Sequence, residues 1–195
     1  MKPRLGTAFF GRDPVSLAPE LLGTVLVHDR RGDRRAGRIV EVEAYCGSAD
    51  PAAHTYRGET PRNRTMFGPA GRLYVYFSYG VHWCANVVCG QEREGVAVLV
   101  RALAPVEGLD SMYAARGNPA KRDRDLCSGP GKLTQAMGIT GDDDGVDLAA
   151  SDRLYVIDDG TGVDEVVQTT RVGISVAVDE PWRWYVAGDP NVSRP

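Results

Sequence analysis

Two glutamates alternate with small apolar residues in the segment RIVEVEAY, residues 38–45. This alternation is typical of a β-strand on which Glu41, Glu43 and Tyr45 share one face, whereas the apolar residues, Val40 among them, share the other. A solvent-facing strand would explain both carboxylates. The strand-like segments that follow are strongly apolar, so we expect this strand to be internal and one of its faces to be covered. A carboxylate in a covered cleft is a candidate general base that activates water.

Five aromatic residues gather around one glycine in RLYVYFSYGVHWCANVV, residues 72–88. Gly80 permits a tight reversal between two strands, at about 72–79 and 82–89, and leaves Tyr79 at or near the tip. A tip residue belongs to the core only if another element covers it, and it can also anchor a partner protein. An uncovered tyrosine at this position is suited to wedging into a stack of bases.

His54 follows Asp50-Pro51, a pattern that predicts a short helical turn, and a purely structural histidine would fit this place equally well. Cys46 and His54 lack the spacing of zinc ligands, and Cys84 with Cys89 is a weak pair. We therefore expect no metal and no other cofactor.

The segment CSGPGKLT, residues 127–134, invites comparison with a phosphate-binding loop. Leu126 replaces the first glycine of that motif and Leu133 follows the lysine in place of Ser or Thr, so the comparison fails. A helix start after the Gly-Pro-Gly turn is the better interpretation, with Lys132 free to meet an anion near the helix N-terminus.

The net charge of −3 disfavours a nucleic-acid partner, but the charges are unevenly distributed. Residues 141–165 carry −8 and residues 166–195 are balanced, which leaves +5 on the first 140 residues. We expect a phosphate-binding face there, with the acidic segment turned away. Four scattered cysteines indicate reduced thiols, and neither a signal peptide nor a membrane span is visible, so we expect a cytoplasmic protein.

The order of the predicted elements favours an α+β fold: a single compact domain over residues 1–195, with a mixed, mostly antiparallel curved sheet, peripheral helices and a protruding β-hairpin. After Asp13-Pro14 we expect two short helical pieces, interrupted at Pro19. The other predicted helices span 106–116 and 131–139. In addition to the strands above, the predicted strands span 24–30, 95–103, 153–159, 171–178 and 183–188.

Taken together, several long strings resemble the alkyladenine (3-methyladenine) DNA glycosylase family, and the resemblance covers nearly the whole chain. The strings are LLGTVLV, RIVEVEAY, DPAAHTYRGETPRNRTMFGPAGRLYVYFSYGVHWCANVV, VLVRALAP, DRDLCSGPGKL and RVGIS. The resemblance implies a DNA repair enzyme that flips alkylated or deaminated purines out of duplex DNA. Such an enzyme hydrolyses the N-glycosidic bond and leaves an abasic site. Double-stranded DNA with damaged purines is the implied partner, and we expect a monomer.

The resemblance also implies a role for each matching position. Glu43 matches the catalytic base. The aromatic walls around the everted base match Tyr45, His54 and Tyr76. Asn86 matches a residue that discourages unmodified guanine, and Arg101 matches an arginine that supports the extruded nucleotide. Tyr79 matches the tyrosine that fills the gap in the duplex. The positions implied to contact DNA phosphates are Arg62, Arg64 and Lys132.

Two other functions remain open at this point. A non-catalytic protein that binds damaged DNA would keep the wedge and the pocket but would have no use for Glu43. A nucleoside hydrolase would need Glu43 but would have no use for Tyr79 or for the arginines of residues 57–72.

Overall fold

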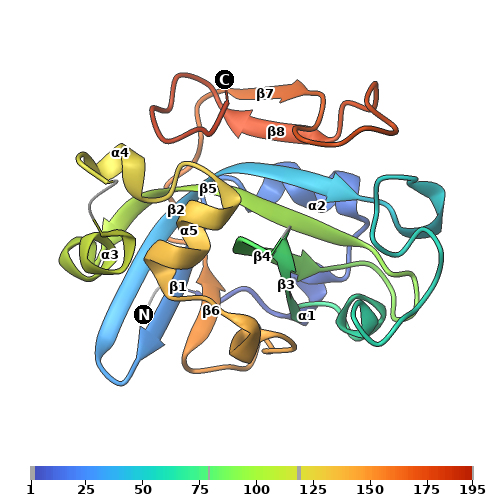
Figure 1. Ribbon diagram of the computed structural model, residues 1–195, viewed down its shortest axis with the longest axis horizontal. Helices are drawn as coiled ribbons and strands as arrows, with labels where there is room; N and C mark the ends of the chain where they lie inside the picture. Colours follow the sequence, from blue (N-terminus) through green and yellow to red (C-terminus); the bar gives the residue numbers. More distant parts are fainter. Residues whose placement is uncertain (1–2, 79, 118–119, 195) are drawn as a thin grey trace.

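The computed structural model describes residues 3–78, 80–117 and 120–194, and its centre is one curled β-sheet with short helices around it (Figure 1). The strands are β1 (Val25–Arg30), β2 (Asp33–Tyr45), β3 (Leu73–Ser78), β4 (His82–Val88), β5 (Ala97–Glu107), β6 (Leu154–Ile157), β7 (Val166–Thr169) and β8 (Arg183–Val186). The α-helices are α1 (Thr7–Phe10), α2 (Pro14–Leu21), α3 (Leu109–Arg116), α4 (Asp123–Leu126) and α5 (Pro130–Met137). The 3₁₀ turns are η1 (Gly47–Ala49), η2 (Arg64–Phe67) and η3 (Gly141–Asp143).

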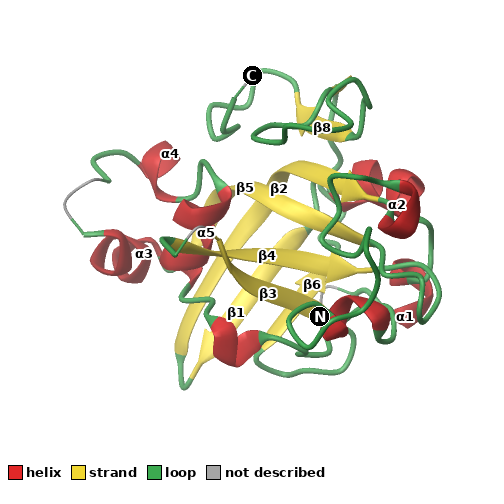
Figure 2. Ribbon diagram, turned by 45° about the vertical axis from the view of Figure 1, so that its right-hand side comes forward, coloured by secondary structure: helices red, strands yellow, loops and turns green. Residues whose placement is uncertain are grey.

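The long strand β2 organises the sheet. The strand order is β3-β4-β5-β2-β1-β6, and β8, which carries β7 on its other side, also pairs with β2. All of these strand pairs within the described residues are antiparallel. The predicted α+β fold with a curved, mostly antiparallel sheet and surrounding helices is confirmed (Figure 2). The protrusion of the β3–β4 hairpin involves residue 79, which lies outside the described residues, and stays a prediction.

β2 begins at Asp33, five residues before the predicted start, because the reversal from β1 needs only two residues. Arg31 and Gly32 supply it with φ angles of 55° and 89°, in the left-handed region that glycine adopts freely. β5 is buried over residues 97–103, which are apolar except for Arg101, and it extends beyond the predicted end to Glu107.

The pairing of β2 with β5 is irregular around Glu41, where the register shifts both before and after this residue. The register with β5 shifts between Ile39 and Glu41, and as a result Val40 packs with Ala102 and Val192 in a separate cluster instead of the main core. Glu41 and Glu43 are both fully buried. The solvent-facing strand that would have explained these carboxylates is therefore excluded.

A single helix, α2, follows Asp13, whose Oδ1 accepts hydrogen bonds from the backbone N–H groups of residues 15 and 16. The prediction of two pieces was wrong, because Pro19 lies inside the helix. An internal proline costs about 3 kcal/mol. The burial of Leu17 and Leu21 against the sheet offsets this cost, since a buried leucine contributes roughly 1.5–3 kcal/mol.

The strand prediction for residues 171–178 was also wrong. These residues form an irregular loop in which Gly173 and Ala177 have φ angles of 78° and 49°. The loop uses its polar groups for contacts with distant parts of the chain, which local sequence patterns do not reveal. At residues 51–57 the chain forms successive turns: Asp50 Oδ1 accepts a hydrogen bond from Ala52 N at 3.0 Å, as expected of an N-cap, and Ala53 N donates to Asp50 O at 2.9 Å.

The acidic segment, residues 141–165, is tied to the rest of the fold by several of its carboxylates. Asp144 accepts hydrogen bonds from Val75 N and Thr65 Oγ1, and Asp159 pairs with Arg38.

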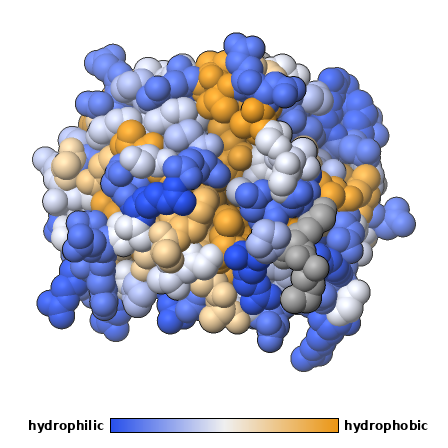
Figure 3. Space-filling view, turned by 180° about the vertical axis from the view of Figure 1, so that it is seen from behind, coloured by the Kyte–Doolittle hydropathy of each residue, from blue (hydrophilic) through white to orange (hydrophobic). Residues whose placement is uncertain are grey.

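One face of the molecular surface, shown in Figure 3, is largely hydrophilic, with apolar residues gathered towards its middle. No helix among the described residues has the length and apolar character needed to span a membrane.

Candidate active site

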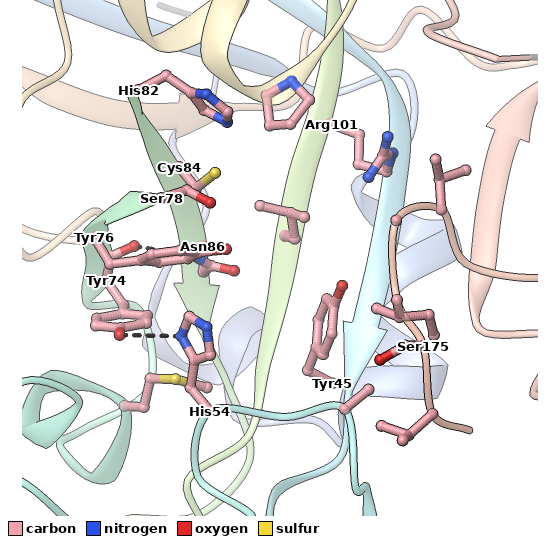
Figure 4. Close-up of a pocket in the computed structure, with 18 of the residues that line it drawn as sticks. Tyr45, His54, Tyr74, Tyr76, Ser78, His82, Cys84, Asn86, Arg101 and Ser175 are labelled. Atoms are coloured by element: carbon pink, nitrogen blue, oxygen red, sulfur yellow. Dashed lines mark hydrogen bonds between the residues drawn. The ribbon is translucent and has the colours of Figure 1, made fainter. Parts of the chain in front are cut away.

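A cavity of about 690 Å³ opens between the β3–β4 hairpin, the ends of β2 and β5, and the loop of residues 172–176 (Figure 4). Tyr45 and the loop line one side. The opposite side consists of aromatic and polar side chains: His54, Tyr74, Tyr76 and Asn86. Arg101 lies at one end of the cavity, on the side of Tyr45 (Figure 4). The structure thus brings together five of the residues predicted to hold a base, although they come from segments up to 56 residues apart in the chain.

The aromatic side is a cluster of three rings. Tyr74 and Tyr76 are stacked, with ring centroids 5.5 Å apart and an interplanar angle of 24°. His54 meets Tyr76 edge to face at 4.4 Å, and His54 Nδ1 lies 3.3 Å from the Tyr74 hydroxyl. Burial, assisted by the charge of Arg62, lowers the pKa of His54 below its ordinary value. His54 is therefore a neutral ring at pH 7, and it has a partner that fixes its orientation.

Tyr45 forms the opposite wall and is held from behind. The Arg171 side chain is fully buried, and its guanidinium carbon lies 4.8 Å from the Tyr45 ring centroid and 5.0 Å from that of Trp182. Asp50 neutralises this arginine through two hydrogen bonds, at 2.5 and 2.9 Å. Burial, followed by the charge of Glu43, raises the pKa of Tyr45, so its hydroxyl remains a hydrogen-bond donor.

Glu43 lies immediately behind the cavity wall and has no exposed surface. The groups in contact with it, however, all belong to residues that line the cavity. Tyr45 Oη donates to Oε2 at 2.9 Å, Val172 N donates to Oε1 at 2.7 Å, and Arg101 Nη1 lies 3.2 Å from Oε1. One hydrogen bond to each oxygen and one ion pair thus fix the position of this carboxylate.

Behind Glu43 lies a second buried carboxylate, Glu41, which shares Arg101 with it. Arg101 Nε donates to Glu41 Oε1 at 3.0 Å, and Arg183 from β8 donates to the same oxygen at 2.9 Å. Burial alone would lower the pKa of Arg101, but the charges of Glu43 and Glu41 raise it. The two carboxylates, Glu41 and Glu43, and the two guanidinium groups, of Arg101 and Arg183, neutralise one another, as buried charges require.

Sequence reasoning missed Arg171, Arg183 and the pairing of Asp50. One signal was available: two carboxylates on a covered strand need cations, and Arg171 and Arg183 are the only basic residues between positions 154 and 193. Asn86 lines the cavity. Its side chain is buried and donates to Tyr74 O at 3.2 Å, which fixes the orientation of the amide.

The residues predicted to contact DNA lie around the cavity mouth or beyond it. Arg62 lines the cavity and donates to Phe77 O at 3.0 Å, whereas Arg64 is exposed and lies 3.5 Å from Glu59. Lys132, in the first turn of α5, donates to Ser128 Oγ at 3.2 Å. Tyr79 lies outside the described residues. No group of three or more His, Cys, Asp or Glu side chains in the described part of the chain could hold a metal ion.

A carboxylate behind a slot of aromatic rings suits an enzyme that hydrolyses a bond to a planar base. The chain belongs to the methylpurine-DNA glycosylase family, whose model matches residues 8–190. It is therefore a DNA repair enzyme, a monofunctional DNA glycosylase that hydrolyses N-glycosyl bonds.

Relatives from bacteria and an archaeon are similar over nearly the whole chain, and each carries the name "Putative 3-methyladenine DNA glycosylase". A Burkholderia lata protein is 56% identical over 98% of this chain and 91% of its own length. A Methanoculleus marisnigri protein is 54% identical over 97% and 98%, and one from Rhodopseudomonas palustris is 49% identical over 99% and 89%.

Proposed function

We propose that residues 1–195 act as one monomeric domain that extrudes a damaged purine from duplex DNA into the cavity and cleaves its N-glycosidic bond with water. A hydrolytic water cannot reach a base that is stacked in the duplex, so extrusion has to precede chemistry. Extrusion costs a few kcal/mol, and stacking on aromatic side chains returns roughly 1–3 kcal/mol per base. Because the two quantities are similar, bases whose pairing is already weakened enter most readily.

In this proposal the base lies between Tyr45 on one side and His54 and Tyr76 on the other. Electron-rich rings favour a cationic alkylated purine over a neutral one. Asn86 is placed to crowd the exocyclic amine of guanine. Its amide is held by Tyr74 O and cannot turn away without the loss of a buried hydrogen bond. The choice of substrate thus depends both on stacking of the base against the rings and on exclusion of unmodified guanine by Asn86.

Glu43 is the proposed general base. Oε1 accepts a hydrogen bond from Val172 N and forms an ion pair with Arg101 Nη1, whereas Oε2 accepts one hydrogen bond, from Tyr45, within the described residues. A carboxylate oxygen has two lone-pair sites, so Oε2 can also accept a hydrogen bond from the attacking water. The ionised carboxylate would deprotonate this water and stabilise the positive charge that develops on the sugar.

Arg101 is proposed to support the extruded nucleotide at the end of the cavity while one edge of its guanidinium contacts Glu43. No lysine is among the described residues that line the cavity. This supports attack by water over attack by a lysine, which would form a covalent intermediate. The expected product is an abasic site in an unbroken strand.

Duplex binding is assigned to Tyr79 as the wedge and to Arg62, Arg64 and Lys132 as phosphate contacts. Lys132 lines a second hollow, of about 460 Å³, together with Arg116, Lys121, Arg122 and one acid, Asp125. In a chain with a net charge of −3, this basic group supports a phosphate-binding role. Pro130, in the same turn of α5 as Lys132, lines the main cavity, so one DNA strand can reach both.

The observation that carries the proposal is the contact of buried Glu43 with Tyr45 and Arg101, both of which face the cavity. The test compares the release of hypoxanthine from a duplex that contains inosine with its release from free inosine. We expect release from the duplex only. Efficient cleavage of the free nucleoside would instead support a nucleoside hydrolase, and lesion binding without any base release would support a non-catalytic binder.

A further inference from the structure

Arg101 is held between two carboxylates that belong to the same strand. Its Nε donates to Glu41 Oε1 at 3.0 Å, and its Nη1 lies 3.2 Å from Glu43 Oε1. Its Nη2 donates to Ser193 Oγ at 3.3 Å. One guanidinium therefore divides its contacts between the proposed general base and a second buried acid.

Glu41 has no part in the proposed reaction. It does not line the cavity and is fully buried. In addition to Arg101, it accepts hydrogen bonds from Arg183 Nη1 at 2.9 Å and from Ser193 N at 2.7 Å. Arg183 is itself fixed, because it donates to Thr170 O at 2.8 Å and to Arg194 O at 2.6 Å. β8 and residues 193–194 thus hold Glu41 rigidly.

The sharing of Arg101 between Glu41 and Glu43 affects which oxygen of Glu43 is open to water. A guanidinium that faces a single carboxylate tends to form two parallel hydrogen bonds with it. Such a pair with Glu43 would occupy Oε2, the oxygen that accepts only the Tyr45 hydroxyl among the described residues. The attacking water would then lose its acceptor. In the observed arrangement Glu41 retains Nε of Arg101, and Glu43 receives only one guanidinium contact, on Oε1.

Arg183 keeps Arg101 from shifting the other way, towards Glu41. Without the charge of Arg183, Glu41 would be the less neutralised of the two carboxylates and would attract Arg101 away from Glu43. We propose that Glu41 and Arg183 are positioning residues that keep Arg101 shared, so that Glu43 keeps one guanidinium contact on Oε1 and its Oε2 stays open to water. This inference rests on the proposed role of Glu43 and adds a function for residues that do not contact substrate.

The test uses Glu41→Gln in single-turnover release of 7-methylguanine from a duplex, with enzyme in excess. We expect the rate to fall at least tenfold, and the Kd for a duplex with a tetrahydrofuran abasic-site analogue to change less than threefold. A crystal structure of the variant should show Arg101 paired with both oxygens of Glu43. The matched control is Asp143→Asn, which removes a buried carboxylate that is paired with Arg153 and does not line the cavity.

A folded Glu41→Gln variant with an unchanged rate would overturn the proposal, as would a rate that falls no further than that of the control. If Glu41→Gln does not fold, Arg183→Lys provides the measurement. This variant keeps a cation beside Glu41, so we expect at least a third of the rate, and a tenfold loss would contradict the proposal. An inactive Glu43→Gln enzyme beside a fully active Glu41→Gln enzyme would reject this inference alone and leave the proposed function intact.

Discussion

The Tyr45 hydroxyl donates a hydrogen bond to Glu43 Oε2 at 2.9 Å, and this bond joins a wall of the base-sized cavity to the carboxylate behind it. Residues i and i+2 of a strand point to the same face, so the spacing of these two residues in β2 is what permits the contact. One wall of the aromatic slot and the carboxylate behind it therefore belong to the same strand.

Replacement of Tyr45 by Phe should slow base release while base binding is retained. The ring remains, but the buried carboxylate loses a donor, and a hydrogen bond to a charged group contributes about 1.5–3 kcal/mol. We expect the single-turnover rate to fall roughly ten- to hundredfold. Tyr76→Phe is the control, because the Tyr76 hydroxyl pairs with Cys84 and forms no hydrogen bond with Glu43 among the described residues. Equal rates for the two variants would show that the contact with Glu43 has no catalytic value.

The pairing of Arg171 with Asp50 should contribute strongly to stability. Both side chains are fully buried, and removal of one partner of a buried pair costs about 3–5 kcal/mol. For a chain of this size, Asp50→Asn should therefore lower Tm by roughly 6–20 °C. The control is Arg64→Gln, which breaks the exposed pair with Glu59 and should leave Tm nearly unchanged. A decrease in Tm as small as that of the control would contradict the stabilising role assigned to the Arg171–Asp50 pair.

The sequence was informative about this site where local pattern determines structure. The alternation in RIVEVEAY placed Glu41, Glu43 and Tyr45 on one face, and the resemblance identified the aromatic residues that meet there. The same pattern left open whether the glutamates face solvent or a covered cleft. Burial depends on β5 and β8, which are distant in sequence, so only the fold decides between these alternatives.

The loop of residues 171–178 illustrates why the remainder could not be predicted. Its β-branched residues have high strand propensity, yet Arg171 pairs with Asp50 and Val172 N donates to Glu43. These long-range contacts override the local preference. The same holds for Arg183, whose role follows from the pairing of β8 with β2 and not from any motif around it.

Stability should fall as the pH drops below the ordinary histidine pKa of 6.5, in part because of His28. Burial is the largest influence on His28 and lowers its pKa, against the opposing effects of Met137 O and Asp143. The unfolded chain therefore binds a proton that the folded chain resists, and protonation favours unfolding. Urea unfolding at pH 7.5 and 5.5 should show a smaller loss of stability for His28→Gln than for the wild type. Identical losses of stability in the variant and the wild type would exclude His28 as a source of the pH dependence.

Lys132 should contribute to the salt dependence of DNA binding. Each phosphate contact contributes about 0.9 to the slope of log K against log salt concentration on B-DNA. Lys132→Gln should therefore reduce the magnitude of this slope by roughly one unit and leave the rate at saturating enzyme unchanged. Arg4→Gln, which alters a cation paired with Asp152 away from both hollows, is the control. A slope equal to that of the wild type would remove Lys132 from the DNA-binding surface.

The most direct test of the account is single-turnover release of 7-methylguanine from a duplex by Glu43→Gln, compared with the wild type at equal saturation. The amide keeps the size of the side chain but cannot deprotonate water, and it would leave Arg101 with one fewer anion. General acid–base catalysis typically contributes 10²–10⁴-fold, so we expect a rate at least about a hundredfold lower, with lesion binding retained. Release by a folded Glu43→Gln enzyme at the wild-type rate would contradict the account.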